Sequence, residues 1–243
     1  MTASVRPVRT ILVAVASLAL ASVGCKDKPT KKAPPANVGS AGAGSGSGPR
    51  PAPDLILPRA DGTPPKKTAK PLERADFEKL TQLEFPGFTK EVRNVGDKAM
   101  EVRQKTKDHP RLWAVVNVQH CFDCQPMELD KWKARQDALK ASTLEVLKDS
   151  KDVDWELGET QINGQKIIYV YQVGTGKADG EGGGQFSFTN SYLVYYNDGN
   201  NEIRVVASYK DDPVSKDDLK RLAPKEDLRA LALSFLDVYT HAW

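Results

Sequence analysis

The stretch SYLVYYNDGNNEIRVVASY, residues 191–209, decides the fold of this chain. Apolar and aromatic residues fill both flanks, and the centre, residues 197–201, is polar and contains a glycine. This pattern predicts two strands joined by a hairpin turn. A second turn of this kind, Asn163-Gly164, separates residues 155–157 from residues 166–173. Successive hairpins imply an antiparallel sheet.

More strands are expected upstream of these hairpins. Between residues 99 and 105, Met100 and Val102 alternate with charged residues, which is typical of a half-buried strand. Residues 112–118 are more uniformly apolar, and this favours a central strand. Together the patterns predict strands at residues 92–95, 99–105, 112–118, 155–157, 166–173, 186–196 and 202–209.

Two segments carry apolar residues at helical spacing, one over residues 129–148 and one after Pro224. A sheet with apolar faces must be covered, so we expect an α+β fold with an antiparallel sheet flanked by two main helices. Trp132 and Phe235 are expected to be buried. A short helical segment is expected near residues 77–83, a glycine-rich loop at 174–184 and an acidic loop at 211–222. The two stripes are Leu129, Trp132, Gln136, Leu139, Thr143, Val146 and Leu147, and Leu228, Leu231, Ala232, Phe235, Val238 and Tyr239.

This order of elements over residues 77–243 resembles the PsbP/Mog-type fold. The resemblance lies in a pattern: the turn Ile162-Asn163-Gly164-Gln165 leads into Ile167-Ile168-Tyr169, Ser191 to Tyr196 follow, and Ala232 to Phe235 close the chain. It implies an α/β/α sandwich with a binding or assembly role and carries over no catalytic residue. Bacterial lipoproteins of the DcrB and LpqN types are similar in tethering such a domain to an envelope membrane.

The N-terminus has the features of an export signal. Arg6 and Arg9 precede an apolar run from Ile11 to Ala21, which is about half of the ~20 residues that span a bilayer. Small residues then lead to Cys25. This resembles the bacterial lipobox, although Ser22 stands where leucine is usual. An ordinary signal peptide that leaves Cys25 as a free thiol is the alternative.

The lipobox resemblance implies a signal peptide at residues 1–24, lipidation of Cys25, and a lipid bilayer as a partner. Acyl chains would hold the protein on a membrane. Lys26 after the cysteine implies the outer membrane in lipoproteins of Gram-negative type. The protein is therefore expected to be exported and lipid-anchored in the cell envelope.

Residues 25–72 are rich in Gly, Ser, Pro and Lys, a composition that cannot bury enough apolar surface to offset its ordering entropy. We expect a flexible linker here and a single domain at residues 73–243 that folds without it. Leu55-Ile56-Leu57 is its apolar island, and it either docks on the domain or is a loose recognition segment. Residues 1–72 contain 11 Lys/Arg and 3 Asp/Glu, whereas residues 73–243 contain 24 and 29. An acidic domain argues against a nucleic-acid partner.

Cys121 and Cys124 form a CxxC motif between a strand and a helix. Thioredoxins present a redox pair in this way, but they also need a proline before a later strand, and residues 127–212 contain none. Pro126 also delays the helix. We favour a structural disulfide, because an oxidising envelope suits one and lipid would occupy Cys25. A redox pair, half of a metal site and free thiols are the alternatives.

The other histidines, glycines and serines do not match the motifs of known functional sites. His109, His120 and His241 lack the spacing of a metal site, the glycines of residues 174–184 precede a strand rather than a phosphate-binding helix, and no serine lies in a G-x-S-x-G context. We expect no catalytic residue, metal or cofactor. The tyrosines are expected to pack across strands, with an aromatic platform for a ligand as the alternative; they are Tyr169, Tyr171, Tyr192, Tyr195, Tyr196 and Tyr209.

The sequence therefore predicts a membrane-anchored, non-enzymatic binding or assembly module that recognises an envelope protein or a small ligand. The main rival is a membrane-tethered thiol–disulfide oxidoreductase that uses Cys121 and Cys124, and a hydrolase with an unrecognised site is a third option.

Overall fold

The computed structural model describes Leu57 and residues 62–122, 124, 127–134, 153–177, 186–211 and 215–243. All of them belong to one compact unit that spans residues 46–243. The predicted export signal, Cys25, residues 26–56 and residues 135–148 of the predicted long helix lie outside the described residues. No described helix is long and apolar enough to cross a membrane.

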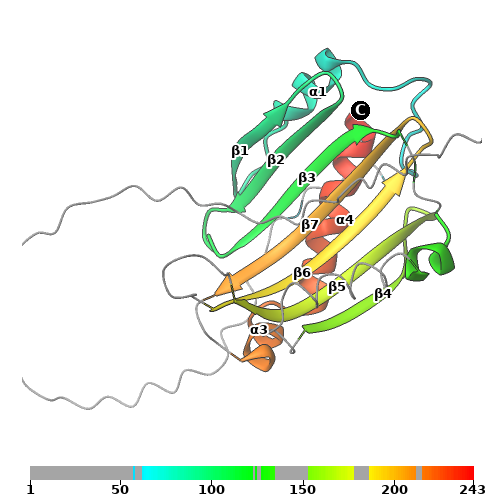
Figure 1. Cartoon of the computed structure of the whole chain (residues 1–243). Helices are drawn as coiled ribbons and strands as arrows, with labels where there is room; N and C mark the ends of the chain where they lie inside the picture. The colour runs from blue at the N-terminus through cyan, green and yellow to red at the C-terminus, as the bar shows by residue number, and fades with distance from the viewer. Residues whose placement is uncertain are drawn as a thin grey trace, which may run out of the picture. The chain divides into compact units, whose positions relative to one another are not determined.

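The predicted α+β class with an antiparallel sheet is confirmed. Seven strands form one sheet in the order β1-β2-β3-β7-β6-β5-β4, and every neighbouring pair is antiparallel (Figure 1). Each predicted strand lies within an observed one. The strands are β1 (Phe88–Val95), β2 (Ala99–Thr106), β3 (Leu112–His120), β4 (Val153–Ile162), β5 (Gln165–Lys177), β6 (Phe186–Asn197) and β7 (Asn201–Asp211).

Two meanders, β1 to β3 and β4 to β7, meet where β3 pairs with β7. The turns within the second meander follow from their sequences. Asn163 and Gly164 both have positive φ, 48° and 81°, as a two-residue type I′ hairpin requires. Gly199 in the turn between β6 and β7 has φ 95°, which L side chains rarely adopt.

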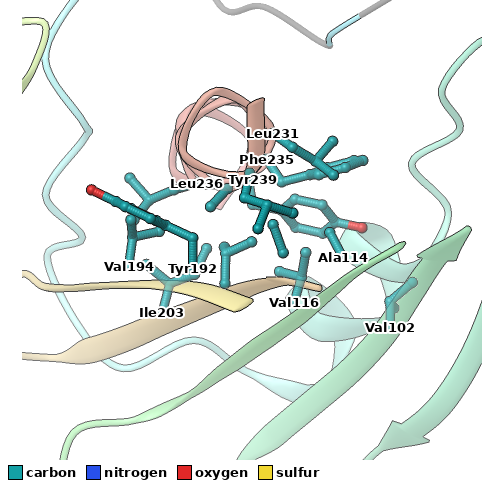
Figure 2. Close-up of a cluster of buried hydrophobic side chains, with 14 of the residues drawn as sticks. Val102, Ala114, Val116, Tyr192, Val194, Ile203, Leu231, Phe235, Leu236 and Tyr239 are labelled. Atoms are coloured by element: carbon teal, nitrogen blue, oxygen red, sulfur yellow. The ribbon is translucent and has the colours of Figure 1, made fainter. Parts of the chain in front are cut away.

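Helix α4 (Lys225–Ala242) covers one face of the sheet across β3, β7 and β6 (Figure 1). Pro224 is its N-cap residue, as the sequence predicts. Figure 2 shows Leu231, Phe235, Leu236 and Tyr239 directed at the sheet. They pack with strand residues in the main core, which includes Val102, Ala114, Val116, Tyr192, Val194 and Ile203.

The opposite face of the sheet carries a smaller core. Residues 129–134 are helical, and Trp132 packs there against Ile168 and Tyr195, its ring centroid 4.8 Å from that of Tyr195. Side chains alternate along a strand, so this cluster lies on the other side from Phe235. As expected, Trp132 and Phe235 are both buried.

Two expected loops contain regular structure. Gly174 to Lys177 continue β5 and pair with residues 186–189 of β6, because a continuous ladder of backbone hydrogen bonds offsets the low strand propensity of glycine. In the expected acidic loop, α3 (Lys216–Leu222) begins at Ser215, whose side chain accepts a hydrogen bond from the Asp218 amide. Leu219 is buried against the main core. The short helix near residue 77 is α1 (Arg74–Thr81).

Gly158 and Tyr169 form a cross-strand pair between β4 and β5. A Cβ atom on Gly158 would lie 2.6 Å from the Tyr169 hydroxyl oxygen. The Tyr169 ring stacks on Tyr192 with centroids 5.0 Å apart, and its hydroxyl donates to Glu156 over 2.6 Å. The ring is therefore held in place and fills the space above the glycine.

We expect Gly158→Ala to lower the free energy of unfolding by about 1–3 kcal/mol, because the added methyl group must displace a restrained ring. Gly96→Ala is the matched control, since its Cβ would meet only the Ala99 carbonyl oxygen at 3.8 Å. Urea denaturation of both variants would measure the difference. Equal midpoints would show that Tyr169 moves aside freely.

Candidate functional site

A network of long-range side-chain hydrogen bonds lies at one end of the sheet. The turns that follow β1, β4 and β6 lie at this end, together with the end of β3 and the C-terminus of α4. Residues 62–72 run across it, and we call them the strap. The strap lies within the predicted flexible linker, so that prediction is corrected for these residues by the contacts described below.

Asp198 fixes the middle of the strap. One carboxylate oxygen accepts hydrogen bonds from the Thr68 amide and hydroxyl, at 2.7 and 2.6 Å. The other accepts from the amides of Asn200 and Asn201, at 2.9 and 2.8 Å. A single carboxylate therefore shapes the turn and holds the strap on it, and such charge-assisted hydrogen bonds are among the stronger ones in proteins.

Asn201 and His120 fix the C-terminal part of the strap. Asn201 is fully buried, its side-chain amide donates to the Thr68 hydroxyl over 2.7 Å, and its carbonyl oxygen accepts from the Leu72 amide over 3.0 Å. His120, the last residue of β3, places Nε2 2.6 Å from the Leu72 carbonyl oxygen. Leu72 itself is buried in the main core. The strap is thus bound by both polar and apolar contacts.

The first residues of the strap lie against the end of α4. The Thr63 hydroxyl is 2.9 Å from His241 Nε2, and the Thr63 carbonyl accepts a hydrogen bond from Asn163 over 2.8 Å. The Trp243 indole donates to the Lys66 carbonyl over 3.0 Å. Farther upstream, Leu57 packs on the main core. Of the two interpretations of the apolar island, docking therefore holds for Leu57.

The CxxC motif follows β3 at the same end. The structure joins Cys121 and Cys124 in a disulfide, with Cα atoms 5.0 Å apart, inside the usual range for such a bond. The Cys121 amide donates to the Asn200 carbonyl over 2.9 Å, which extends the pairing of β3 with β7 by one residue. The described helix begins only at Leu129, which agrees with the prediction that Pro126 delays it.

The disulfide loop exposes an aromatic side chain. Phe122 is 72% exposed, whereas Phe77 on α1 is fully buried. The His120 ring lies between them, 5.6 Å from the Phe77 ring and 5.8 Å from the Phe122 ring. Lys98 Nζ lies 5.1 Å from the Phe122 centroid, within the range of a cation–π contact. The sequence analysis did not single out Phe122, because a lone phenylalanine says nothing of its exposure.

The rings of Tyr169 and Tyr171 pack across strands against Tyr192, with centroids 5.0 and 6.2 Å apart, as the favoured prediction has it. Desolvation first, and then the hydrogen bond to Glu156, raise the pKa of Tyr169 to about 12. The Lys225 ammonium and the Tyr169 hydroxyl lower the pKa of Glu156 by hydrogen bonding to its carboxylate. Lys225 Nζ also lies 5.3 and 5.4 Å from the ring centroids of Tyr169 and Tyr171. The Lys225 side chain thus lies over the two rings, where a ligand of an aromatic platform would otherwise bind. Buried tyrosines include Tyr171, Tyr192, Tyr195 and Tyr196.

The candidate metal ligands remain apart in the described part of the chain, where no three His, Cys, Asp or Glu side chains are placed to hold a metal ion. His120 and His241 instead contact the strap. Asp198, Asn201 and Thr68 were missed by the sequence analysis, since Asp and Asn are ordinary turn residues and their long-range partners are not visible in a local pattern.

Comparison with known proteins adds little to this geometry. No protein-family model matches the chain, and no curated protein matches it. The solved structure of the human StarD13 (DLC2) lipid transfer and protein localization domain is similar at 9% sequence identity, over 64% of this chain and 90% of that one, with a TM-score of 0.27. A TM-score this low supports no argument about function.

We expect removal of the strap to destabilise the domain. A chain of residues 73–243 loses the buried Leu72 side chain, about 1.5–3 kcal/mol, and leaves the Asn201 amide unpaired, about 1–3 kcal/mol. Its melting temperature should be roughly 5 to 15 °C below that of residues 46–243. Residues 26–243 are the control and should have the same melting temperature as residues 46–243. Equal melting temperatures of all three chains would mean that the strap does not stabilise the domain.

Proposed function

We propose that this protein is an exported lipoprotein of the cell envelope, held on a membrane by acyl chains on Cys25, and that its domain is a non-enzymatic binding or assembly module. The observation that carries the proposal is the disulfide loop, which holds Phe122 in solvent at the end of the sheet crossed by the strap. Aromatic side chains, phenylalanine included, are enriched at binding surfaces relative to the rest of a protein surface.

The anchoring part of the proposal rests on the N-terminal sequence. A basic start, a short apolar run, small residues and Cys25 are followed by a polar tether, and Lys26 favours the outer membrane. The strap supports this arrangement, because it brings the chain that follows the tether to a fixed place on the domain. The order of strands and helices supports a PsbP/Mog-type domain, whose resemblance implies binding of an envelope protein or a small ligand.

The oxidoreductase alternative is favoured by one observation, a CxxC disulfide whose cysteines are both partly accessible. Two features oppose it. The described helix starts five residues beyond Cys124, and the field of a helix N-terminus falls off within the first turn, so the helix is too far away to activate either cysteine. His120 directs Nε2 at the Leu72 carbonyl and is thereby engaged in holding the strap.

We expect Cys25→Ala to move the protein from the membrane to the soluble fraction, because the acyl chains supply most of the membrane affinity. Carbonate-washed membranes from cells that express each form would show the change on an immunoblot. A variant with Cys121→Ser and Cys124→Ser is the matched control and should remain with the membranes. Retention of Cys25→Ala in the washed membranes would place the anchor elsewhere.

We expect the Cys121–Cys124 disulfide to behave as a structural bond. The protein should not reduce insulin, and the double serine variant should lose about 2 kcal/mol of stability or less, since the closed loop is very short. Redox titration against glutathione buffers gives the decisive value. A potential in the range of catalytic dithiols, with a thiol pKa well below 8, would favour the oxidoreductase instead.

A further inference from the structure

We infer that Asn163 is a site of spontaneous deamidation, and that the carboxylate formed there releases the first part of the strap from the domain. Asn163 is the one asparagine of the chain that a glycine follows. Attack by the next backbone nitrogen on an asparagine side chain is least hindered when the next residue has no Cβ atom. The modification would take place in the turn between β4 and β5, which contacts both the strap and α4.

The reaction needs only the chain itself and water. The Gly164 backbone nitrogen bonds to Cγ of Asn163, the bond between Cγ and Nδ2 breaks, and Nδ2 leaves as ammonia with the proton of the Gly164 amide. The cyclic imide then takes up one water molecule. Opening at Cγ gives aspartate, and opening at the backbone carbonyl carbon gives isoaspartate, in which the main chain runs through the former side chain. Both products carry a carboxylate where the amide was.

The turn leaves the Gly164 nitrogen open to this reaction. The ladder between β4 and β5 ends at the pair Ile162↔Gln165, so Asn163 and Gly164 lie outside it. In the described part of the chain the Gly164 amide donates to no backbone carbonyl. Gly164 is exposed, and no atom beyond its chain neighbours lies within 4 Å of the position that a Cβ would take. Water therefore has access to the reacting atoms.

Two hydrogen bonds restrain the Asn163 side chain while the strap is bound. Nδ2 donates to the Thr63 carbonyl oxygen over 2.8 Å and to Asp237 Oδ1 over 3.0 Å. The amide must leave both acceptors before Cγ can turn toward the Gly164 nitrogen. Because Thr63 belongs to the strap, local opening of the strap removes one of the two restraints, and surface segments open far more often than a whole domain unfolds. Deamidation should therefore be slow while the strap is bound and faster when it opens.

The product cannot restore these contacts. A carboxylate has no N–H group, so it donates neither to the Thr63 carbonyl nor to Asp237. The new charge would also lie beside the Asp237 carboxylate, whose side chain is only 12% exposed, and like charges repel more strongly where water is largely excluded. The loss of ammonia is not reversed in water, so each deamidation permanently favours the open strap.

The rest of the strap has contacts of its own, which the modification leaves in place. Asp198 accepts from the Thr68 amide and hydroxyl, and Asn201 accepts from the Leu72 amide. Opening should therefore be largest at residues 62–67, which include the exposed Lys66 and Lys67. Cleavage of the chain after these lysines is a direct measure of opening.

The first test is peptide mass spectrometry of the purified protein after storage in mildly alkaline buffer. The peptide that contains Asn163 should gain about one dalton, and the peptide with the exposed Asn94, which valine follows, should not. Thr68→Val removes the hydroxyl that binds Asp198 and should speed deamidation of Asn163 about fivefold. Thr89→Val, an exposed threonine of edge strand β1, is the matched control and should leave the rate unchanged.

The second test is limited trypsin digestion of Asn163→Asp, which has the side chain of the aspartate product. Cleavage after Lys66 or Lys67 should be about tenfold faster than in the parent chain. Asn94→Asp makes the same change of charge at an exposed site and should be cleaved at the parental rate. An unmodified Asn163 in both the parent and Thr68→Val, equal mass gain at Asn94, or parental cleavage of Asn163→Asp would each overturn the inference.

Discussion

The pairing of β3 with β7 is the constraint on which the other parts of this domain depend. It joins two local meanders into one sheet and runs from Leu112↔Tyr209 to His120↔Asn201 without a break in register. The inward pairs Ala114↔Ala207 and Val116↔Val205 are fully buried below α4. Without this pairing, each meander would expose an unpaired central edge, and α4 would have no continuous face on which to pack.

The same pairing also determines where the polar end of the domain forms. Because β3 ends opposite the start of β7, His120 and Asn201 lie side by side, and both contact Leu72. Asp198 in the adjoining turn supplies the next contact to the strap. A one-residue slip would reverse the faces of these side chains. The register of two buried strands thus positions the polar groups that hold the strap.

Local patterns were sufficient for much of this fold, and their failures have physical reasons. Period-two alternation and the Asn163-Gly164 turn located the sheet, because burial on one face dictates that alternation. The strap was assigned to a linker because its stability comes from backbone groups and from turn residues far along the chain. The same holds for Gly174 to Lys177, where pairing with β6 outweighs composition. The pattern Ser215-x-x-Asp218 marks the N-cap of α3. It lies in a run of charged residues, and the segment was therefore assigned to a loop.

The Cys121–Cys124 disulfide is better understood as a local restraint than as a source of global stability. Closing so short a loop restricts the unfolded chain little, by about 2 kcal/mol in the loop-entropy relation. Its effect on the folded chain is larger, because β3 has already ended and the described helix has not begun. The His120 ring lies between the ring of Phe77, which is buried, and the ring of Phe122. The covalent closure keeps Phe122 above the other two rings, so its exposure follows from the backbone that carries it.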